Sequence, residues 1–213
     1  MTKSLIILGA GSFGKEIYSR LSGCHGYSTD WLFKGFLDDN LDAFGDRGWH
    51  NHNVLDTPKN YIPNKSDVFI SSVSTPIIRK KLVDEINNKG GEFISIFHKS
   101  SVIDESSQIG KGVFVSPFCN ISCDTKIGNH CLFNSYSAIG HDVIIEDFCH
   151  INSFSLIGGY VHIGEITTVH PSAVIIPSKR VGSNVVVGAG SIVISNVPDN
   201  RTVFGNPAKF LSS

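Results

Sequence analysis

Residues 103–198 read IDESSQ-IGKGVF-VSPFCN-ISCDTK-IGNHCL-FNSYSA-IGHDVI-IEDFCH-INSFSL-IGGYVH-IGEITT-VHPSAV-IIPSKR-VGSNVV-VGAGSI-VISNVP, which is sixteen hexads without a break. Every hexad opens on Ile or Val, except one that opens on Phe133. A period of six fits neither the 3.6 of a helix nor the two of an isolated strand. It fits a coil whose flat sides are short strands and whose corners are turns, with equivalent residues stacked.

Two further positions of the hexads support such a coil. The fourth residue after each large one is small or β-branched in every hexad except at Lys179, as a second inward position requires. Gly follows the large residue in seven hexads, where we expect corners with positive φ, at 110, 128, 140, 158, 164, 182 and 188. Three sides would make eighteen residues per coil, although the period alone gives neither the number of sides nor the hand.

The composition is that of a soluble protein of one or two domains. The 213 residues are 41% hydrophobic with a net charge of −1, so nothing indicates nucleic-acid binding. No apolar run has membrane-spanning length, and the first ten residues lack a signal-peptide layout, which predicts a cytoplasmic protein without membrane contact. Three of the five cysteines fall at the small inward position and are expected in the core: Cys119, Cys131 and Cys149.

The first hundred residues carry a different pattern. A strand is predicted over 4–8, then Gly9-Ala10-Gly11-Ser12-Phe13-Gly14 opens a helix over 15–21. Strand, GxGxxG and helix is the arrangement that cradles a phosphate, although such a loop by itself is also found as a tight turn. The second strand, 31–37, ends at Asp38-Asp39, at the distance where an acidic residue contacts a ribose or base.

Further elements complete a βαβαβ unit with a parallel sheet. We expect a strand over 67–71, a helix over 76–89 and a strand over 91–96, with loops at 44–54 and 61–64. A full dinucleotide fold needs two such halves, and here the hexads begin instead. The expected ligand is therefore a single nucleotide, with or without a sugar, and not NAD.

Among nine histidines, His141 is the candidate base. It follows Gly140 at a corner and precedes Asp142, whose carboxylate can orient the imidazole, favour one tautomer and strengthen it as a base. No two histidines of the hexads are eighteen residues apart, so none stack, and we expect no metal site within one chain.

The chain resembles the left-handed β-helix acyltransferases of the hexapeptide-repeat superfamily. The resemblance rests on the hexads, on Gly140-His141-Asp142 and on the ending Gly205-Asn206-Pro207-Ala208. Together with the glycine loop and Leu37-Asp38-Asp39, it narrows to bacterial enzymes that N-acetylate nucleotide-linked 4-amino-4,6-dideoxy sugars for surface glycans, such as the bacillosamine-pathway and sialic-acid-locus enzymes.

The resemblance implies a fold, an assembly and a set of site residues. The fold is a half-Rossmann α/β nucleotide-sugar-binding domain, residues 1–98, followed by a left-handed parallel β-helix, residues 99–213. The assembly is a homotrimer with acetyl-CoA as co-substrate between subunits and no metal. The catalytic residues are His141 as general base and Asp142. The remaining roles are acetyl-CoA contacts at His150, Gly159 (through its N–H to the thioester oxygen), Pro171, Gly188 and Ala189, and sugar-nucleotide contacts at Gly11, Ser12, Phe13, Asp38, Asp39 and Asn134.

The chain departs from the family in three places. Lys99 follows His98, the residue that opens the β-helix, where the family commonly has Pro. Val73-Ser74 occupies a position that often holds Gly, which weakens the expectation of nucleotide contacts there, and Lys179 stands in a usually small slot, so that coil is expected to bulge. The alternative functions are O-acetylation of a sugar or sialic acid hydroxyl, a non-catalytic β-helix scaffold that senses nucleotides, and a β-helix metalloenzyme, against which the histidine spacing argues.

Overall fold

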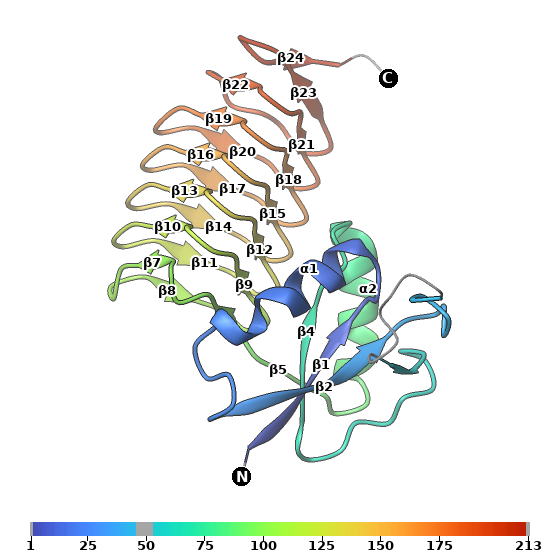
Figure 1. Ribbon diagram of the computed structural model, residues 1–213. Coiled ribbons are helices and arrows are strands. Elements are labelled where there is room, and N and C mark those ends of the chain that lie inside the picture. Colours follow the sequence, from blue (N-terminus) through green and yellow to red (C-terminus); the bar gives the residue numbers. More distant parts are fainter. Residues whose placement is uncertain (1, 46–52, 212–213) are drawn as a thin grey trace. The chain divides into compact units, whose positions relative to one another are not determined.

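The computed structural model describes residues 2–45 and 53–211. The chain divides into two compact units, Met1–Ile96 and Phe97–Ser213, drawn in Figure 1. Among the described residues, no helix has both the length and the apolar character needed to cross a bilayer.

The first unit is built on a parallel five-stranded sheet in the order β3-β2-β1-β4-β5. Its central strand β1 is buried from Leu5 to Leu8, as a strand covered on both faces must be. The strands are β1 (Lys3–Leu8), β2 (Trp31–Leu37), β3 (Val54–Asp56), β4 (Asp67–Ser71) and β5 (Glu92–Phe93). The helices are α1 (Ser12–Arg20), the short 3-10 helix η1 (Leu21–Gly23) and α2 (Pro76–Asn87).

Most elements of this unit lie where the sequence predicts them. The strands 31–37 and 67–71 are confirmed at those residues, whereas the first helix begins three residues earlier than expected, at Ser12. Strand β3 was not predicted. It begins at Val54, the last residue of the expected loop 44–54, and its three residues carry too little periodicity to be recognised. Of that loop, 46–52 lie outside the described residues.

The second unit is a three-sided parallel coil, and the strand pairing shows its repeat. Ile121 pairs with Ile139 and Lys126 with Ile144, so neighbouring strands within a stack are eighteen residues apart. Figure 1 shows the short strands of successive coils lying one above another. The first stack contains β7 (Val102–Ile103), β10 (Asn120–Ile121), β13 (Ala138–Ile139), β16 (Leu156–Ile157), β19 (Val174–Ile175) and β22 (Ile192–Val193).

Two further stacks close the coil. The second contains β8 (Gln108–Ile109), β11 (Lys126–Ile127), β14 (Ile144–Ile145), β17 (His162–Ile163) and β20 (Arg180–Val181). The third contains β6 (Ile96–Phe97), β9 (Phe114–Val115), β12 (Leu132–Phe133), β15 (His150–Ile151), β18 (Thr168–Val169), β21 (Val186–Val187), β23 (Thr202–Phe204) and the antiparallel β24 (Lys209–Phe210). Corner 1 follows the first stack, corner 2 the second and corner 3 the third.

The core of the coil is the predicted column of large residues. Ile121, Phe133, Ile145 and Ile157 are almost fully buried, as are Cys119, Cys131 and Cys149 at the small inward position. A fully buried aliphatic side chain stabilises a fold by about 1.5–3 kcal/mol, so stacking them through every coil accounts for a fold made of two-residue strands. None of the five cysteines forms a disulfide.

The expected reason for the corner glycines is wrong. None of the seven has positive φ; the left-handed corner residue lies two positions further on and is usually not glycine, for example Asp142 (φ 55°) and Tyr160 (φ 60°). Where glycine occupies the first corner position, a Cβ would come too close to the next coil. A Cβ at Gly140 would lie 2.7 Å from the nitrogen of Gly159.

The ladder at Lys179 is regular toward the preceding coil only. The N–H of His162 donates to the carbonyl of Lys179 at 2.9 Å, as in the other coils. Toward the following coil the register shifts: Val181 pairs with Val197, and the N–H of Arg180 donates to Oδ1 of Asn196 at 2.9 Å. The irregularity expected near Lys179 therefore lies on the side of the following coil.

Candidate active site

His141 lies in corner 1, directly after β13. Its Nδ1 is 2.8 Å from Oδ2 of Asp142, and the two side chains are 51% and 40% exposed. Because an ionised carboxylate only accepts hydrogen bonds, this contact places the ring proton on Nδ1 and leaves Nε2 as an acceptor. The pair that the sequence singled out is thus in the arrangement that a general base requires.

The next coil covers the imidazole. A Cβ built on Gly159 would lie 2.8 Å from both Cε1 and Nε2 of His141, so a side chain there would displace the imidazole. The N–H of Tyr160 donates to the carbonyl of His141 at 3.0 Å, and the tyrosine ring meets the imidazole edge to face, with centroids 5.1 Å apart. Tyr160 was missed by sequence reasoning, although its position eighteen residues after Asp142 marks it as a neighbour.

The N–H of Gly159 differs from several of its equivalents at corner 2, although Gly159 itself is buried. At corner 2, side chains of the following coil cap some of these N–H groups, as when Asn129 N–H donates to Asp147 at 2.7 Å. The residue above Gly159 is Pro177, and within the described part of the chain no protein acceptor takes the Gly159 N–H. A donor next to an imidazole is the geometry in which a developing oxyanion can be held.

The other predicted coenzyme and sugar residues lie away from His141. Asn134 is at corner 3, at the opposite end of the first stack, and its Nδ2 donates to Asn152 at 3.1 Å. Pro171 is also at corner 3, where its carbonyl accepts the N–H of Gly190, next to Gly188-Ala189. His150 is on β15 in the third stack and is buried. One chain therefore brings His141, Asp142 and Gly159 together, but not the rest.

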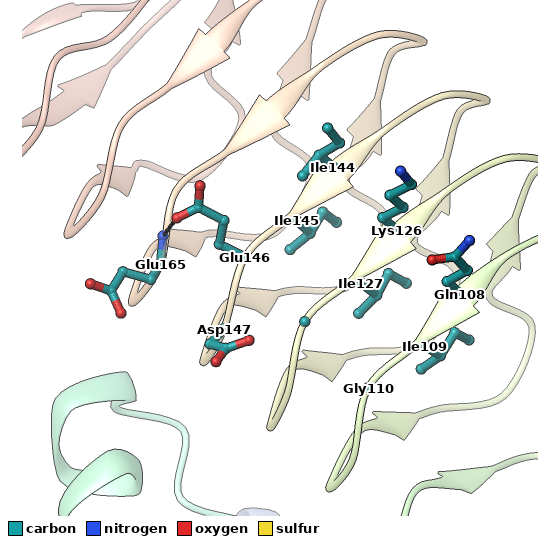
Figure 2. A pocket seen from close by; sticks show the side chains of 11 residues that line it. Gln108, Ile109, Gly110, Lys126, Ile127, Ile144, Ile145, Glu146, Asp147 and Glu165 are labelled. Atoms are coloured by element: carbon teal, nitrogen blue, oxygen red, sulfur yellow. Dashed lines mark hydrogen bonds between the residues drawn. The ribbon is translucent and has the colours of Figure 1, made fainter.

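A groove of about 580 Å³ runs along the second stack, beside corner 2. Figure 2 shows Gln108, Lys126 and Ile144 aligned along its length, with Glu146 and Glu165 at one end. His141 and Asp142 do not line it. Within one chain, the candidate base is therefore outside this groove, at a corner where its side chain is about half exposed.

A hydrogen-bonded network that the sequence did not reveal lies at the end of this groove. Nε2 of His162 is 2.7 Å from Oε1 of Glu146, and Nη1 of Arg180 is 3.2 Å from Nδ1 of His162. Because a guanidinium cannot accept a hydrogen bond, Nδ1 must be unprotonated, so His162 is neutral here and donates from Nε2. His162 and Arg180 are eighteen residues apart, and this spacing could have revealed that they are neighbours. Sequence reasoning missed the pair because it looked at that spacing only between one histidine and another.

The glycine loop of the first unit is built for a close approach. Gly9 has φ +102°, and a Cβ at Gly14 would lie 2.1 Å from the carbonyl oxygen of Gly9. Ser72 is buried and donates to the carbonyls of Leu8 and Gly9 at 2.8 and 2.9 Å, which holds the loop against the end of β4.

The predicted nucleotide contacts begin α1. Gly11 is its N-cap and brings no side chain to the first turn, which contains no acidic residue. Gly11 and Ser12 are exposed and Phe13 is half-buried, so the N-terminal end of the helix dipole is accessible to an anion.

The two acidic residues after β2 differ in their availability. Oδ2 of Asp38 accepts the N–H of Ala10 at 2.7 Å, and its Oδ1 accepts the N–H of Asn40 at 2.9 Å. Asp38 thus ties the glycine loop to the end of β2 with both oxygens. Asp39 is exposed and is the carboxylate of the pair that faces solvent.

No three His, Cys, Asp or Glu side chains converge as metal ligands in 2–45 or 53–211. Residues 124–159, which include His141, match the family model described as bacterial transferase hexapeptide (six repeats). The match lies within the hexapeptide repeats that the chain carries over residues 103–198.

Two curated relatives of this chain are sugar acetyltransferases. One is GDP-perosamine N-acetyltransferase of Escherichia coli O157:H7, 32% identical over 136 residues that cover 61% of this chain and 58% of the relative. The other is UDP-N-acetylbacillosamine N-acetyltransferase of Bacillus subtilis (strain 168), 30% identical over 116 residues, 53% and 51% of the two chains. The chain thus spans little more than half the length of the relatives it matches.

A solved structure extends the likeness to both units. It is a His-to-Asn mutant of perosamine N-acetyltransferase from Caulobacter crescentus, in complex with CoA and GDP-perosamine. The TM-score is 0.89 at 23% identity, with 100% of this chain and 99% of that chain covered. The chain therefore shares its fold.

Proposed function

We propose that this protein transfers the acetyl group of acetyl-CoA to the 4-amino group of a nucleotide-linked amino-deoxy sugar, for a bacterial surface glycan. The observation that carries the proposal is the corner where Nε2 of His141 is an acceptor and the N–H of Gly159 has no protein partner among the described residues. The names of both curated relatives and the ligands bound in the solved structure agree with it.

The residues of the corner divide the chemistry between them. The neutral amine attacks the thioester carbonyl, the C–N bond forms, and Nε2 of His141 takes the proton that the nitrogen loses. Asp142 stabilises the resulting imidazolium through the Nδ1–H contact. The Gly159 N–H holds the oxyanion, a contact worth about 3 kcal/mol in other enzymes. Collapse of the tetrahedral intermediate breaks the C–S bond and releases CoA thiolate, which recovers a proton.

The first unit would bind the nucleotide part of the acceptor. Its diphosphate fits the N-terminus of α1 at Gly11, Ser12 and Phe13, where backbone N–H groups and the helix dipole favour an anion. Asp39 is placed to accept a hydrogen bond from the ribose or base, with Asp38 as the residue that positions the loop.

The site would be completed by a second copy of the chain in a homotrimer of left-handed coils. His141 and Gly159 are at corner 1, whereas Asn134, Pro171, Gly188 and Ala189 are at corner 3, at the other end of the first stack. Corner 1 of one copy beside corner 3 of another joins the two sets around one acetyl-CoA. His150 is buried within one chain, so its contact with acetyl-CoA needs a change in its surroundings.

The acceptor class is tested by a thiol-release assay with acetyl-CoA. UDP-, dTDP- and GDP-linked 4-amino-4,6-dideoxy sugars are compared with the corresponding 4-hydroxy sugars. We expect thiol release with one of the amino sugars and none with its hydroxy analogue. Turnover of hydroxy sugars alone would support O-acetylation, and binding of nucleotide sugars without turnover would support a scaffold.

The role of His141 is tested by His141→Ala. We expect kcat to fall by roughly 10²–10⁴-fold with an unchanged melting temperature, because general-base catalysis contributes that factor and the side chain is exposed. His25→Ala is the control, since His25 is an exposed residue of the first unit that has no part in the mechanism. A His141→Ala protein as active as the wild type removes His141 from the mechanism.

A further inference from the structure

Lys179 interrupts a column of buried side chains in corner 1. The equivalent residue of the preceding coil, Val161, is 1% exposed, whereas Lys179 is half-buried. In the following coil the register shifts, since Val197 pairs with Val181, so no equivalent side chain continues the column beyond Lys179. A half-buried lysine at an inward position can bury its aliphatic stem and keep its ammonium group at the surface. A valine would pack better than a lysine at this inward position, which indicates a functional role for the positive charge.

The ammonium group of Lys179 forms no hydrogen bond or ion pair with residues 2–45 or 53–211. Its neighbour Arg180 is also exposed and is oriented by His162, whose Nδ1 accepts from Nη1 at 3.2 Å. Two cations are thus adjacent here, and neither has an anionic partner in the described part of the chain.

The charges of corner 1 are segregated along the coil. Asp104, Glu105, Asp124 and Asp142 lie at the coil of His141 or before it, and these corner turns contain no lysine or arginine. The corner turns that follow contain no acidic residue, and their one cation is Lys179. Of the strand residues that flank the corner, Lys126 lies before His141 and Arg180 after it. A polyanion reaching His141 is therefore favoured on the Lys179 side.

We infer that Lys179 binds a phosphate group of CoA, so that the coenzyme extends from His141 toward the C-terminal coils. This rests on the proposed function. Lys179 is two coils beyond the turn of His141, and a rise of about 4.8 Å per coil puts it about 10 Å along the axis. The pantetheine arm has about the length of four extended residues, on the order of 14 Å, which the reach of a lysine side chain accommodates.

The test compares coenzyme fragments on Lys179→Val, which fits the column, and on Lys179→Arg, which keeps the charge. We expect Lys179→Val to raise the Kd of CoA about tenfold, as loss of one charge-assisted contact does, and to leave the Kd of pantetheine, which has no phosphate, within twofold of wild type. 3′-Dephospho-CoA shows whether the diphosphate or the 3′-phosphate is bound. Lys126→Gln, which removes a cation on the other side of His141, is the matched control.

The outcomes separate the inference from the proposed function. A wild-type protein that binds CoA, together with a Lys179→Val protein that binds it equally well, overturns the inference and leaves acetyl transfer standing. Equal weakening of CoA and pantetheine also overturns it, because the effect is then not on the phosphates. A wild-type protein that does not bind CoA overturns both. A melting temperature of Lys179→Val at or above that of wild type shows that the fold is intact.

Discussion

The imidazole of His141 is held by neighbours that contact different parts of the ring. Asp142 accepts from Nδ1, Gly159 lies against Cε1 and Nε2, and Tyr160 packs edge to face. All four residues belong to two successive turns of corner 1. Their effect is to fix the ring while leaving Nε2 as the acceptor.

Gly159→Ala tests this arrangement at the level of one methyl group. The new Cβ would lie 2.8 Å from the imidazole, so we expect the ring to shift and kcat to fall by about 10²-fold, as misplacement by about 1 Å does in other enzymes. Steady-state kinetics measure the change. Ser195→Ala, at an exposed position in the last turn of corner 1, should retain wild-type kcat. Unchanged kinetics for Gly159→Ala would show that the close contact has no catalytic role.

Between elements of the first unit, a buried ionic network joins β2 to β4. Asp67 begins β4 with a fully buried side chain and accepts from Lys34 of β2 at 2.7 Å, from Tyr61 at 2.7 Å and from the N–H of Asn64 at 2.8 Å. Burial by itself raises the pKa of the Asp67 carboxyl, but these hydrogen bonds outweigh it, and the pKa is below its ordinary value. Burial by itself lowers the pKa of Lys34. Its hydrogen bonds to Asp67 and Tyr61 outweigh burial, so the pKa of Lys34 is above its ordinary value.

The lowered pKa of Asp67 makes the free energy of unfolding depend on pH in the acid range. A carboxyl with a lower pKa in the folded state stabilises the fold above its unfolded pKa of about 3.9, and this contribution is lost as the pH falls through the folded value. We expect Asp67→Asn to lose about 3 kcal/mol of unfolding free energy at pH 7, because it leaves a buried charge network without its anion.

Denaturant unfolding between pH 7 and pH 2 provides the measurement. The difference between wild type and Asp67→Asn should begin to narrow below about pH 4, where the carboxyl of the unfolded chain gains a proton, and should be lost once the pH has fallen through the lower folded pKa. Asp84→Asn is the control, since this exposed carboxyl of α2 is 3.6 Å from Lys80 and a surface pair contributes at most about 1 kcal/mol. If the difference in unfolding free energy between wild type and Asp67→Asn were the same at every pH, the effect would come from packing and not from charge.

At the scale of the whole molecule, the first stack and the corners at its two ends carry exposed apolar side chains. Phe118, Tyr136 and Phe154 form a ladder at corner 3 with ring centroids 5.0 Å apart, and Leu156 and Tyr160 continue the apolar surface toward corner 1. Phe154 and Tyr160 are each 61% exposed. An apolar surface of this extent is typical of an interface between copies of a chain.

Light scattering after gel filtration tests the assembly. We expect a mass three times the 23.1 kDa of one chain, because a closed ring of three copies covers the same surface on each. Leu156→Asp should dissociate it and abolish activity, since the residues at corners 1 and 3 are then separated. Ile62→Asp, at an 80% exposed position of the first unit, should remain trimeric. A fully active monomer would contradict the intersubunit site.

The sequence by itself determined the coil and the candidate base. Six-residue periodicity is a property of the chain, and because every coil repeats the same contacts with its neighbours, the inward column from Ile103 to Val193 could be read without coordinates. The pair His141-Asp142 was recognisable because its members are adjacent, and the glycine loop because strand, turn and helix follow one another directly.

Only the tertiary structure decided what depends on stacking across eighteen residues or on strand order. It showed that the corner glycines avoid the next coil and do not supply positive φ, that Tyr160 packs on His141, and that Glu146, His162 and Arg180 form a network. It also showed that both oxygens of Asp38 are engaged by backbone N–H groups. These contacts join residues far apart in the chain, and no local pattern records which atom of a side chain meets which partner.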